Sequence, residues 1–364
     1  MSSDSLESIC SVLTVTSEEF DTVYENDSIK TDVLIDEARN IIGKNRSRLR
    51  EAEHRYRLDD LLSAMLLHAP NPEGQRYVAI CLHIAHEKGA DGVVNAAQAW
   101  SDNLLLPMLA IYKAMKTEPA SSQTPTIDIT MQHIESASRN DQRLLRTQVA
   151  QREKYRCAIT KVFDLARVRK LQREQRFGEI PPGAKSDMAA AHIVPFSLNK
   201  FNDKATSSPE ITNAARTWDM LQSWTRIDLK TLVGSNINSP MNAIYMTTSE
   251  HSMFGRFEFY LEKEAYPDIP NKYKVRMARQ GGTLSNGSVD SDVEFPTLEV
   301  SSVEPPNPIC LKIHAAFAKV LHLCGAAEYI ESVERDAETE GTLRLNGETD
   351  FASYLRSKIP IIVH

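Results

Sequence analysis

Apolar side chains recur every three or four residues between positions 32 and 116, which is the periodicity of amphipathic helices. The sets with this spacing are Leu61, Leu62, Met65 and Leu66; Val78, Ile80, Cys81 and Ile84; and Leu104, Leu105, Met108, Leu109 and Tyr112. Pro70, Pro72 and the stretch Gly89–Gly92 interrupt the pattern and predict helix ends. The first third of the chain is therefore predicted to hold an all-helical domain over residues 29–117.

The pattern changes on both sides of this helical domain. Residues 1–28 are acidic and rich in Ser and Thr, which predicts a flexible tail, and residues 118–138 have the composition of a linker. Residues 139–283 alternate short β-branched runs with helical ones. Residues 284–364 contain one helix with an apolar face, predicted from Pro308 to about Arg335, and we expect them to pack on the preceding domain. The predicted fold class is α+β.

The composition is that of a globular protein. The chain has 364 residues, of which 41% are hydrophobic and 25% charged, and its formal net charge is −7. This charge excludes a uniformly basic coat for nucleic acid, although a local cluster of Lys and Arg is enough to bind phosphate.

Cysteine use and the N-terminus bear on location. Five scattered cysteines with no CxxC pair favour a reducing compartment and argue against a disulfide framework. The acidic N-terminus lacks the pattern of a signal peptide, and no stretch approaches the ~20 apolar residues that span a bilayer. We expect an intracellular protein, nuclear or cytoplasmic, that does not enter membranes.

The middle of the chain predicts a strand, a turn, a second strand and a helix. The segment AAHIVPFSL (190–198) begins as an apolar strand that Pro195 closes, and NINSPMNAIYM (236–246) contains a turn followed by a strand. Ser249 is the predicted N-cap of a short helix that carries His251 on its first turn. Between the strands lies a long insertion, residues 198–235, with a predicted helix that packs Trp218, Leu221 and Trp224 inward. An insertion of this length is often functional, and we expect it to shape substrate access.

This order brings together residue types that phosphodiester hydrolysis requires. A base must deprotonate water and a cation must neutralise charge on the phosphorane, and an imidazole serves as base near neutral pH. His192 on the first strand and His251 on the helix supply two imidazoles. Asn242, at the start of the second strand, supplies a side-chain amide that can clamp the intervening loop.

The segments AAHIVPFSL, NINSPMNAI and EHSMFG, with the preceding YRCAIT and the following FGRFEFYLE, resemble the HNH endonuclease family, particularly HNH domains of uncharacterised fungal proteins. The resemblance covers about residues 60–335 and is weakest in the helical N-terminal part. It implies a central ββα-metal unit in which His192 is the general base, Asn242 orients the loop and His251 binds a divalent metal. The implied ion is Mg²⁺ in preference to Mn²⁺ or Zn²⁺, and the implied partner is nucleic acid, with DNA favoured over RNA.

Two positions depart from the family pattern. Ala191 stands where many relatives carry an acidic residue, and Gly255 stands where bacterial relatives often carry an aspartate. Asp187 is four strand residues upstream, about 13 Å along a straight strand. Glu250 and Glu258 are the acids closest to the second histidine. The departures leave two hypotheses open: an active metal-dependent endonuclease, or a degenerate HNH scaffold that binds nucleic acid or protein. A helical adaptor ranks third, and the oligomeric state is open.

A basic cluster lies directly upstream of these motifs. Between positions 143 and 176 the chain places Arg143, Arg146, Arg152, Lys154, Arg156, Lys161, Arg167, Arg169, Lys170, Arg173 and Arg176. Lys and Arg contact phosphates without base-specific geometry, so nucleic-acid contacts are predicted for Arg152, Lys154, Arg156, Arg167, Arg169 and Lys170. The alternative is a solvent-exposed amphipathic helix.

Other candidate groups favour structural roles. Cys81, His83 and His86 lie close together on a predicted helix without a fourth ligand, which favours helix packing over a metal site. His314 and His322 are predicted to be core or interface residues. Cys157 is predicted to be a buried thiol.

Overall fold

The computed structural model describes residues 30–52, 55–108, 143–194, 217, 220–227, 238–263, 265–289 and 291–339. It divides into two compact units. Unit 1 comprises Met1–Thr117, Ser197–Leu229 and Lys319–His364, and unit 2 comprises Glu118–Phe196 and Lys230–Ala318. The predicted tail (1–28) and linker (118–138) lie outside the described residues. The finer division of the chain into five segments stays a prediction.

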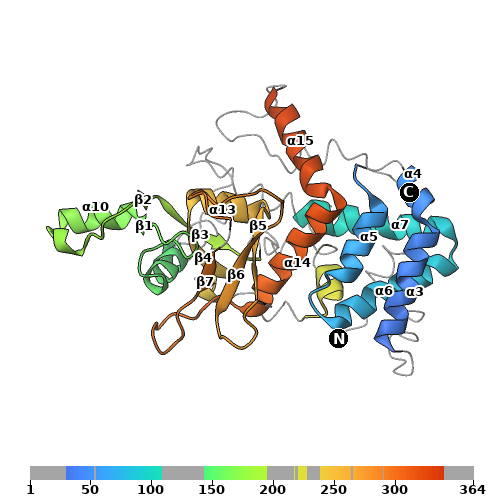
Figure 1. Cartoon of the computed structure of the whole chain (residues 1–364), viewed down its shortest axis with the longest axis horizontal. Helices are drawn as coiled ribbons and strands as arrows, with labels where there is room; N and C mark the ends of the chain where they lie inside the picture. The colour runs from blue at the N-terminus through green and yellow to red at the C-terminus, as the bar shows by residue number, and fades with distance from the viewer. Residues whose placement is uncertain are drawn as a thin grey trace, which may run out of the picture. The chain divides into compact units, whose positions relative to one another are not determined.

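Unit 1 is helical, as the periodicity of residues 29–117 predicts (Figure 1). Its helices are α3 (Thr31–Lys44), α4 (Arg46–Glu51), α5 (Leu58–Leu67), α6 (Pro72–Glu87) and α7 (Ala90–Trp100), followed by a π turn, η1 (Ser101–Leu105), and by α15 (Ala326–Thr339) near the C-terminus. The N-cap of α6 is Asn71, whose side chain accepts a hydrogen bond from Gly74 N at 2.7 Å. The helices α3 and α5 pack on α6, so the apolar face of α6 lies at the centre of this unit.

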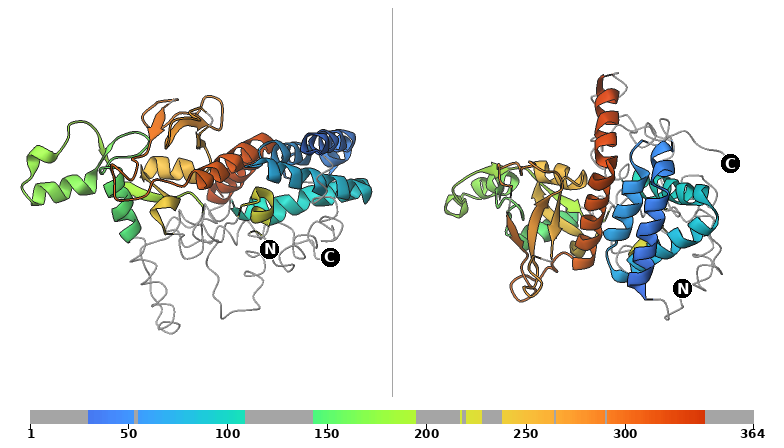
Figure 2. Two further views of the ribbon diagram at one scale, coloured as in Figure 1. Left: turned by 90° about the horizontal axis from the view of Figure 1, so that it is seen from below. Right: turned by 45° about the vertical axis from the view of Figure 1, so that its right-hand side comes forward.

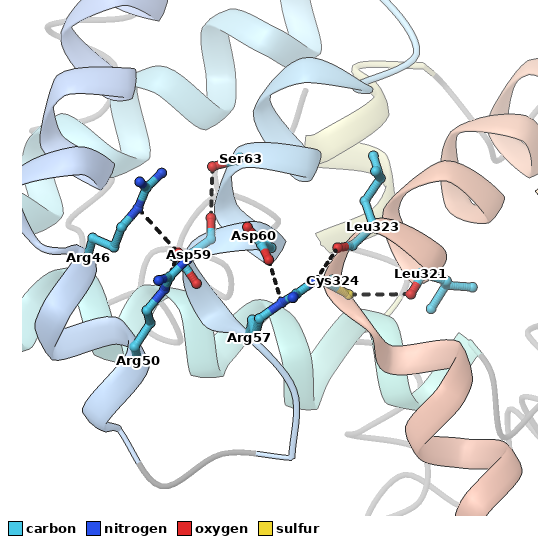
Figure 3. A network of polar contacts seen from close by, with 9 residues as sticks. All are labelled: Arg46, Arg50, Arg57, Asp59, Asp60, Ser63, Leu321, Leu323 and Cys324. Carbon is cyan, nitrogen blue, oxygen red and sulfur yellow. Dashed lines mark hydrogen bonds and ion pairs between the residues drawn. The ribbon is translucent and has the colours of Figure 1, made fainter. Parts of the chain in front are cut away.

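Two helices replace the single C-terminal helix predicted from Pro308 to about Arg335. The chain forms α14 (Pro308–Cys324) and then α15, which are separated by Gly325 with φ +85°. Glycine adopts this left-handed conformation at low cost, so it ends α14. Arg57 bonds the last carbonyls of α14, donating from its backbone N–H to Cys324 O and from its guanidinium to Leu323 O (Figure 3). Among the described residues no single helix is long and apolar enough to span a membrane. Helix α14 and the first part of α15, to Val333, reach that length and apolarity only together, and the chain bends by 78° between them.

The described part of the insertion belongs to unit 1. Residues 220–225 are helical, with Leu221 and Trp224 buried as predicted, and Trp218 lies outside the described residues. Trp224 Nε1 donates to Met65 O at 3.1 Å. A Cβ at Gly74 would lie 2.2 Å from Trp224 O, so glycine at this position permits the close approach. The insertion therefore packs against α5 and α6.

A ββα unit lies at the centre of unit 2, which gives the whole chain its α+β fold (Figure 1). Strand β3 (Met188–His192) pairs antiparallel with β4 (Ala243–Thr247), with His192 opposite Ala243, and α13 (Thr248–Gly255) follows β4 directly. Every residue of β4 is buried. A second, antiparallel sheet contains β5 (Phe259–Glu262), β6 (Lys272–Met277) and β7 (Asp292–Glu294).

A small lobe, which we call the α10 lobe (residues 163–186), precedes the central hairpin. It contains β1 (Phe163–Asp164), α10 (Leu165–Arg173), the 3₁₀ turn η3 (Phe177–Glu179) and β2 (Lys185–Ser186), with β1 and β2 parallel. A cluster of Phe163, Val168 and Leu171, with Tyr155 and Ile180 packed against it, forms its apolar core. In Figure 2 the lobe extends away from the sheet of β5, β6 and β7.

Candidate active site

His192 is the last residue of β3 and is 7% exposed. With the proton on Nε2, the ring donates a hydrogen bond to Asn238 Oδ1 at 3.0 Å, and Nδ1 is then the basic nitrogen. Asn238 had no role in the sequence-based prediction, although it lies in the segment NINSP that marks the turn. The structure therefore adds Asn238 to the site as the group that orients the imidazole.

Burial keeps both site histidines neutral near pH 7. It lowers the pKa of His192; the hydrogen bond that the ring donates to Asn238 opposes this shift, and the nearby His251 adds to it. Burial also lowers the pKa of His251. A neutral imidazole is the form that accepts a proton or binds a metal, so both residues are in the state that their predicted roles require.

Asn242 clamps the chain just beyond β3. Its Oδ1 accepts from Val194 N and its Nδ2 donates to Val194 O, both at 2.9 Å, while its backbone carbonyl accepts from Ile193 N. The side chain is buried, so these bonds are shielded from water. Paired bonds to the backbone N–H and C=O of one residue fix where the chain leaves β3 and therefore the direction of His192. These bonds support the loop-orienting role predicted for Asn242, which stays a prediction.

Arg152 was predicted to contact nucleic acid, and for this residue the prediction is wrong. Its guanidinium is 0% exposed and donates to Pro240 O at 2.8 Å, Ala243 O at 2.7 Å and Glu304 O at 2.8 Å. It also bonds Glu153 at 2.7 Å. The first two carbonyls flank Asn242 in the chain, so Arg152 holds the turn that presents this asparagine. The amino-acid sequence shows only a run of basic residues and does not reveal that the side chain of Arg152 is buried.

The helix that carries His251 has a capping box. Its N-cap is Thr247 and not the predicted Ser249, because the Thr247 hydroxyl accepts from Glu250 N while it donates to the Glu250 carboxylate. The other carboxylate oxygen of Glu250 accepts from Ser285 N at 3.0 Å, and the residue is fully buried. Glu250 is thereby committed to the fold and does not serve as a metal ligand.

Few of the described side chains near His251 could bind a metal ion. No group of three or more His, Cys, Asp or Glu side chains suited to a metal occurs within the described ranges, and this includes the helix with Cys81, His83 and His86. Ala191 is a buried apolar residue, and Gly255 lies one helical turn beyond His251 without a side chain. Glu258 is bound to Arg256. Among the described residues, a metal bound at His251 would therefore need water or substrate oxygens to complete its coordination.

The other predicted nucleic-acid contacts fall into two groups. Arg156 donates to Lys161 O at 3.0 Å and lies over the ring of Phe163, and Arg167 lies over the ring of Tyr155 with 4.5 Å to the centroid. Both are therefore half-buried through contacts within unit 2. The exposed members are Lys154, Arg169 and Lys170. Of these, Arg169 and Lys170 lie on α10.

His314 of α14, which was predicted to be a core or interface residue, is buried and contacts α13. Its Nε2–H donates to Phe254 O at 3.0 Å, and its ring stacks between Phe254 and Phe257, with centroids 3.7 and 4.7 Å away. Burial lowers the pKa of His314 to about 3. The bond satisfies a carbonyl in the last turn of the helix that carries His251. Cys157 is buried, as predicted.

Comparison with known proteins gives one match. The model of a family described as HNH endonuclease matches residues 157–262. The matched segment begins at Cys157, ends with β5 and includes His192, Asn242 and His251. No curated protein and no solved structure matches the chain.

Proposed function

We propose that the protein hydrolyses phosphodiester bonds in nucleic acid, and in DNA in preference to RNA, because residues 157–262 match the model of a family described as HNH endonuclease. HNH domains are nucleases in general. One observation carries the proposal for this chain: the β3–β4–α13 unit brings His192 and His251 together, and Asn242 fixes the chain between them.

In the proposed reaction His192 removes a proton from water, which attacks phosphorus in line with the departing oxygen. Asn238 holds the Nε2–H side of the ring, so Nδ1 takes the proton. Asn242 keeps the end of β3 in place, which limits the positions that the imidazole can occupy. No covalent intermediate with the protein is required.

A divalent ion bound by His251 would neutralise charge on the phosphate and on the leaving oxygen. With His251 as the proposed protein ligand, water and phosphate oxygens would complete the coordination. Magnesium is commonly held in this way, with few protein ligands and several waters, and is the first ion to test.

A second candidate function is a degenerate HNH scaffold that binds nucleic acid or protein without cleaving it. The scarcity of ligands favours it, because Ala191 and Gly255 contribute no donor and Glu250 is engaged elsewhere. A dependence of cleavage on added Mg²⁺, Mn²⁺ or Zn²⁺ supports the enzyme. Absence of cleavage with every ion supports the scaffold.

The decisive experiment measures cleavage of plasmid DNA and of a single-stranded oligonucleotide by purified protein with each ion or with EDTA. His192→Ala should lower the cleavage rate by about 10²- to 10⁴-fold, which is the typical contribution of a general base. The fold should be preserved, because the histidine is the last residue of β3 and Asn242 holds the chain beyond this strand through its own side chain.

The matched control is His83→Ala, which removes a partly exposed histidine of α6 outside the HNH segment. Its cleavage rate should equal that of the unaltered protein. Undiminished cleavage by His192→Ala would remove His192 from the mechanism.

A further inference from the structure

The α10 lobe concentrates positive charge in an acidic protein. Residues 163–186 contain six Lys and Arg against three Asp and Glu, and one of these acids, Asp164, is buried. The net charge of the whole chain is −7. The lobe therefore presents a local cationic surface that a polyanion would recognise.

Three cations share one face of α10. Arg169, Lys170 and Arg173 are exposed, while Val168 and Leu171 on the other face enter the core of the lobe. Arg169 and Arg173 have no acidic partner among the described residues, and the Nζ of Lys170 lies 3.9 Å from Glu174. These charges are thus little compensated by neighbouring side chains.

An exposed aromatic side chain lies just beyond the helix that carries these cations. Phe177 is 62% exposed and is the one aromatic side chain among the large, exposed apolar residues of the described part of the chain. The chain turns sharply after α10, where Gln175 has φ +58° and Arg176 N donates to Leu171 O at 2.8 Å. This turn brings η3, which begins with Phe177, against the C-terminal end of α10 near Arg173.

We propose that the α10 lobe binds a single-stranded segment of the substrate, with phosphates on Arg169, Lys170 and Arg173 and a base stacked on Phe177. This inference takes its nucleic-acid substrate from the proposed function and adds that the bound segment is single-stranded. Cationic grooves with exposed rings bind single strands because every unpaired base offers a flat face. A duplex conceals those faces, so the ring would add nothing to duplex binding.

The lobe is fastened to the strand that pairs with β3. Asp164 Oδ1 caps α10 by accepting from Ala166 N at 2.8 Å, and Asp164 Oδ2 accepts from the hydroxyl of Tyr245 at 2.5 Å. Tyr245 belongs to β4, and its partner across the hairpin is Ala190, two residues before His192. A nucleic-acid strand bound to the lobe would therefore be held at a fixed distance from the β3–β4 hairpin, whose first strand ends at His192.

The test measures binding separately from cleavage. Full-length His192→Ala protein in EDTA is titrated into labelled oligo(dT), oligo(rU) and a duplex, each about 20 nucleotides long, which exceeds the site sizes of single-strand binding folds. Fluorescence anisotropy gives Kd at a series of salt concentrations. We expect both single strands to bind more tightly than the duplex, and the dT and rU arms report whether the sugar matters.

Two variants separate the two kinds of contact. Phe177→Ala should raise the Kd for single strands by about 5- to 100-fold without changing its salt dependence, because stacking is not ionic. Replacing Arg169, Lys170 and Arg173 together by Gln should reduce the slope of log K against log salt by about 2. Arg176→Gln is the matched control, because Arg176 is exposed on the same lobe but already pairs with Glu174 and Glu179.

The proposal is overturned if the duplex binds as tightly as the single strands, if Phe177→Ala leaves Kd unchanged, or if Arg176→Gln has the same effect as the triple variant. These outcomes are independent of the nuclease proposal. A protein that binds single strands through the lobe but cleaves nothing would refute only the proposed enzyme. A protein that cleaves but binds independently of the lobe would refute only this inference.

Discussion

Arg152 in unit 2 and Asp59 in unit 1 are both buried, but their charged partners differ in exposure. The carboxylate partner of Arg152 is buried as well: the Glu153 side chain is 6% exposed, and the other acceptors are backbone carbonyls, of which that of Ala243 belongs to a buried residue. In unit 1 the buried Asp59 is paired with Arg50 at 2.9 Å and Arg46 at 3.4 Å, whose side chains are 54% and 58% exposed (Figure 3).

The difference in the exposure of their partners predicts how strongly Arg152 and Asp59 each stabilise the fold. Loss of Arg152 leaves a buried carboxylate without its partner and removes the donor to three backbone carbonyls, two of which flank Asn242. Loss of Asp59 releases two exposed arginines that water can solvate at once. We therefore expect a buried charge to contribute most to stability where its charged partner is buried too, and Arg152 meets this condition beside the turn that carries Asn242.

The largest expected effect is that of Arg152→Met, which removes the charge and keeps an apolar side chain of similar length. It should lower the free energy of unfolding by about 3–5 kcal/mol, because breaking a buried pair leaves an uncompensated charge. Urea unfolding measures this change. Cleavage should fall as well, because the turn that carries Asn242 loses its support.

Arg152→Lys is the matched variant. It restores the charge near Glu153, but one ammonium does not span the carbonyls of Pro240, Ala243 and Glu304, so its stability should lie between those of Arg152→Met and the unaltered protein. Equal unfolding midpoints for Arg152→Met and the unaltered protein would contradict the contrast with Asp59.

An effect that is smaller at about pH 5, and that depends on pH, is expected from His314. Its folded-state pKa of about 3 lies below the value of about 6.5 for an unfolded chain, so on acidification the unfolded chain binds the proton first. The contribution of His314 to the free energy of unfolding is fully present above about pH 6.5 and falls by about 1.4 kcal/mol per pH unit toward pH 3. Unfolding at a series of pH values measures the slope.

His314→Phe should flatten this acid dependence, because it removes the titrating group and keeps a ring between Phe254 and Phe257. His68→Gln in unit 1 is the control: burial also lowers the pKa of His68, but the residue is only half-buried. If His68→Gln flattened the curve more than His314→Phe did, the assignment to His314 would be wrong.

The smallest effect is expected from Asp59→Asn. The amide keeps the shape of the carboxylate, and the released arginines remain in solvent, so stability should fall by only about 1–2 kcal/mol. Cleavage should not change. A loss as large as that of Arg152→Met would show that exposed partners do not soften the removal of a buried charge.

The sequence alone determined the local elements and the identity of the motif. Helical periodicity predicted the helices of residues 29–117, and the order of strand, turn, strand and helix predicted β3, β4 and α13. These signals are local, because alternation, turn residues and caps act within a few positions. The errors were local too: Thr247 replaces Ser249 as the cap, and Gly325 divides the C-terminal helix.

Only the tertiary structure decided which polar side chains face inward. Arg152 and Arg169 read alike in the basic cluster, yet one is buried against the turn of Asn242 and the other is exposed on α10. Likewise Glu250, a candidate ligand by position, is bound to Ser285, 35 residues away. Burial and pairing depend on segments distant in the chain, and no periodicity within one segment encodes which distant segment will cover it.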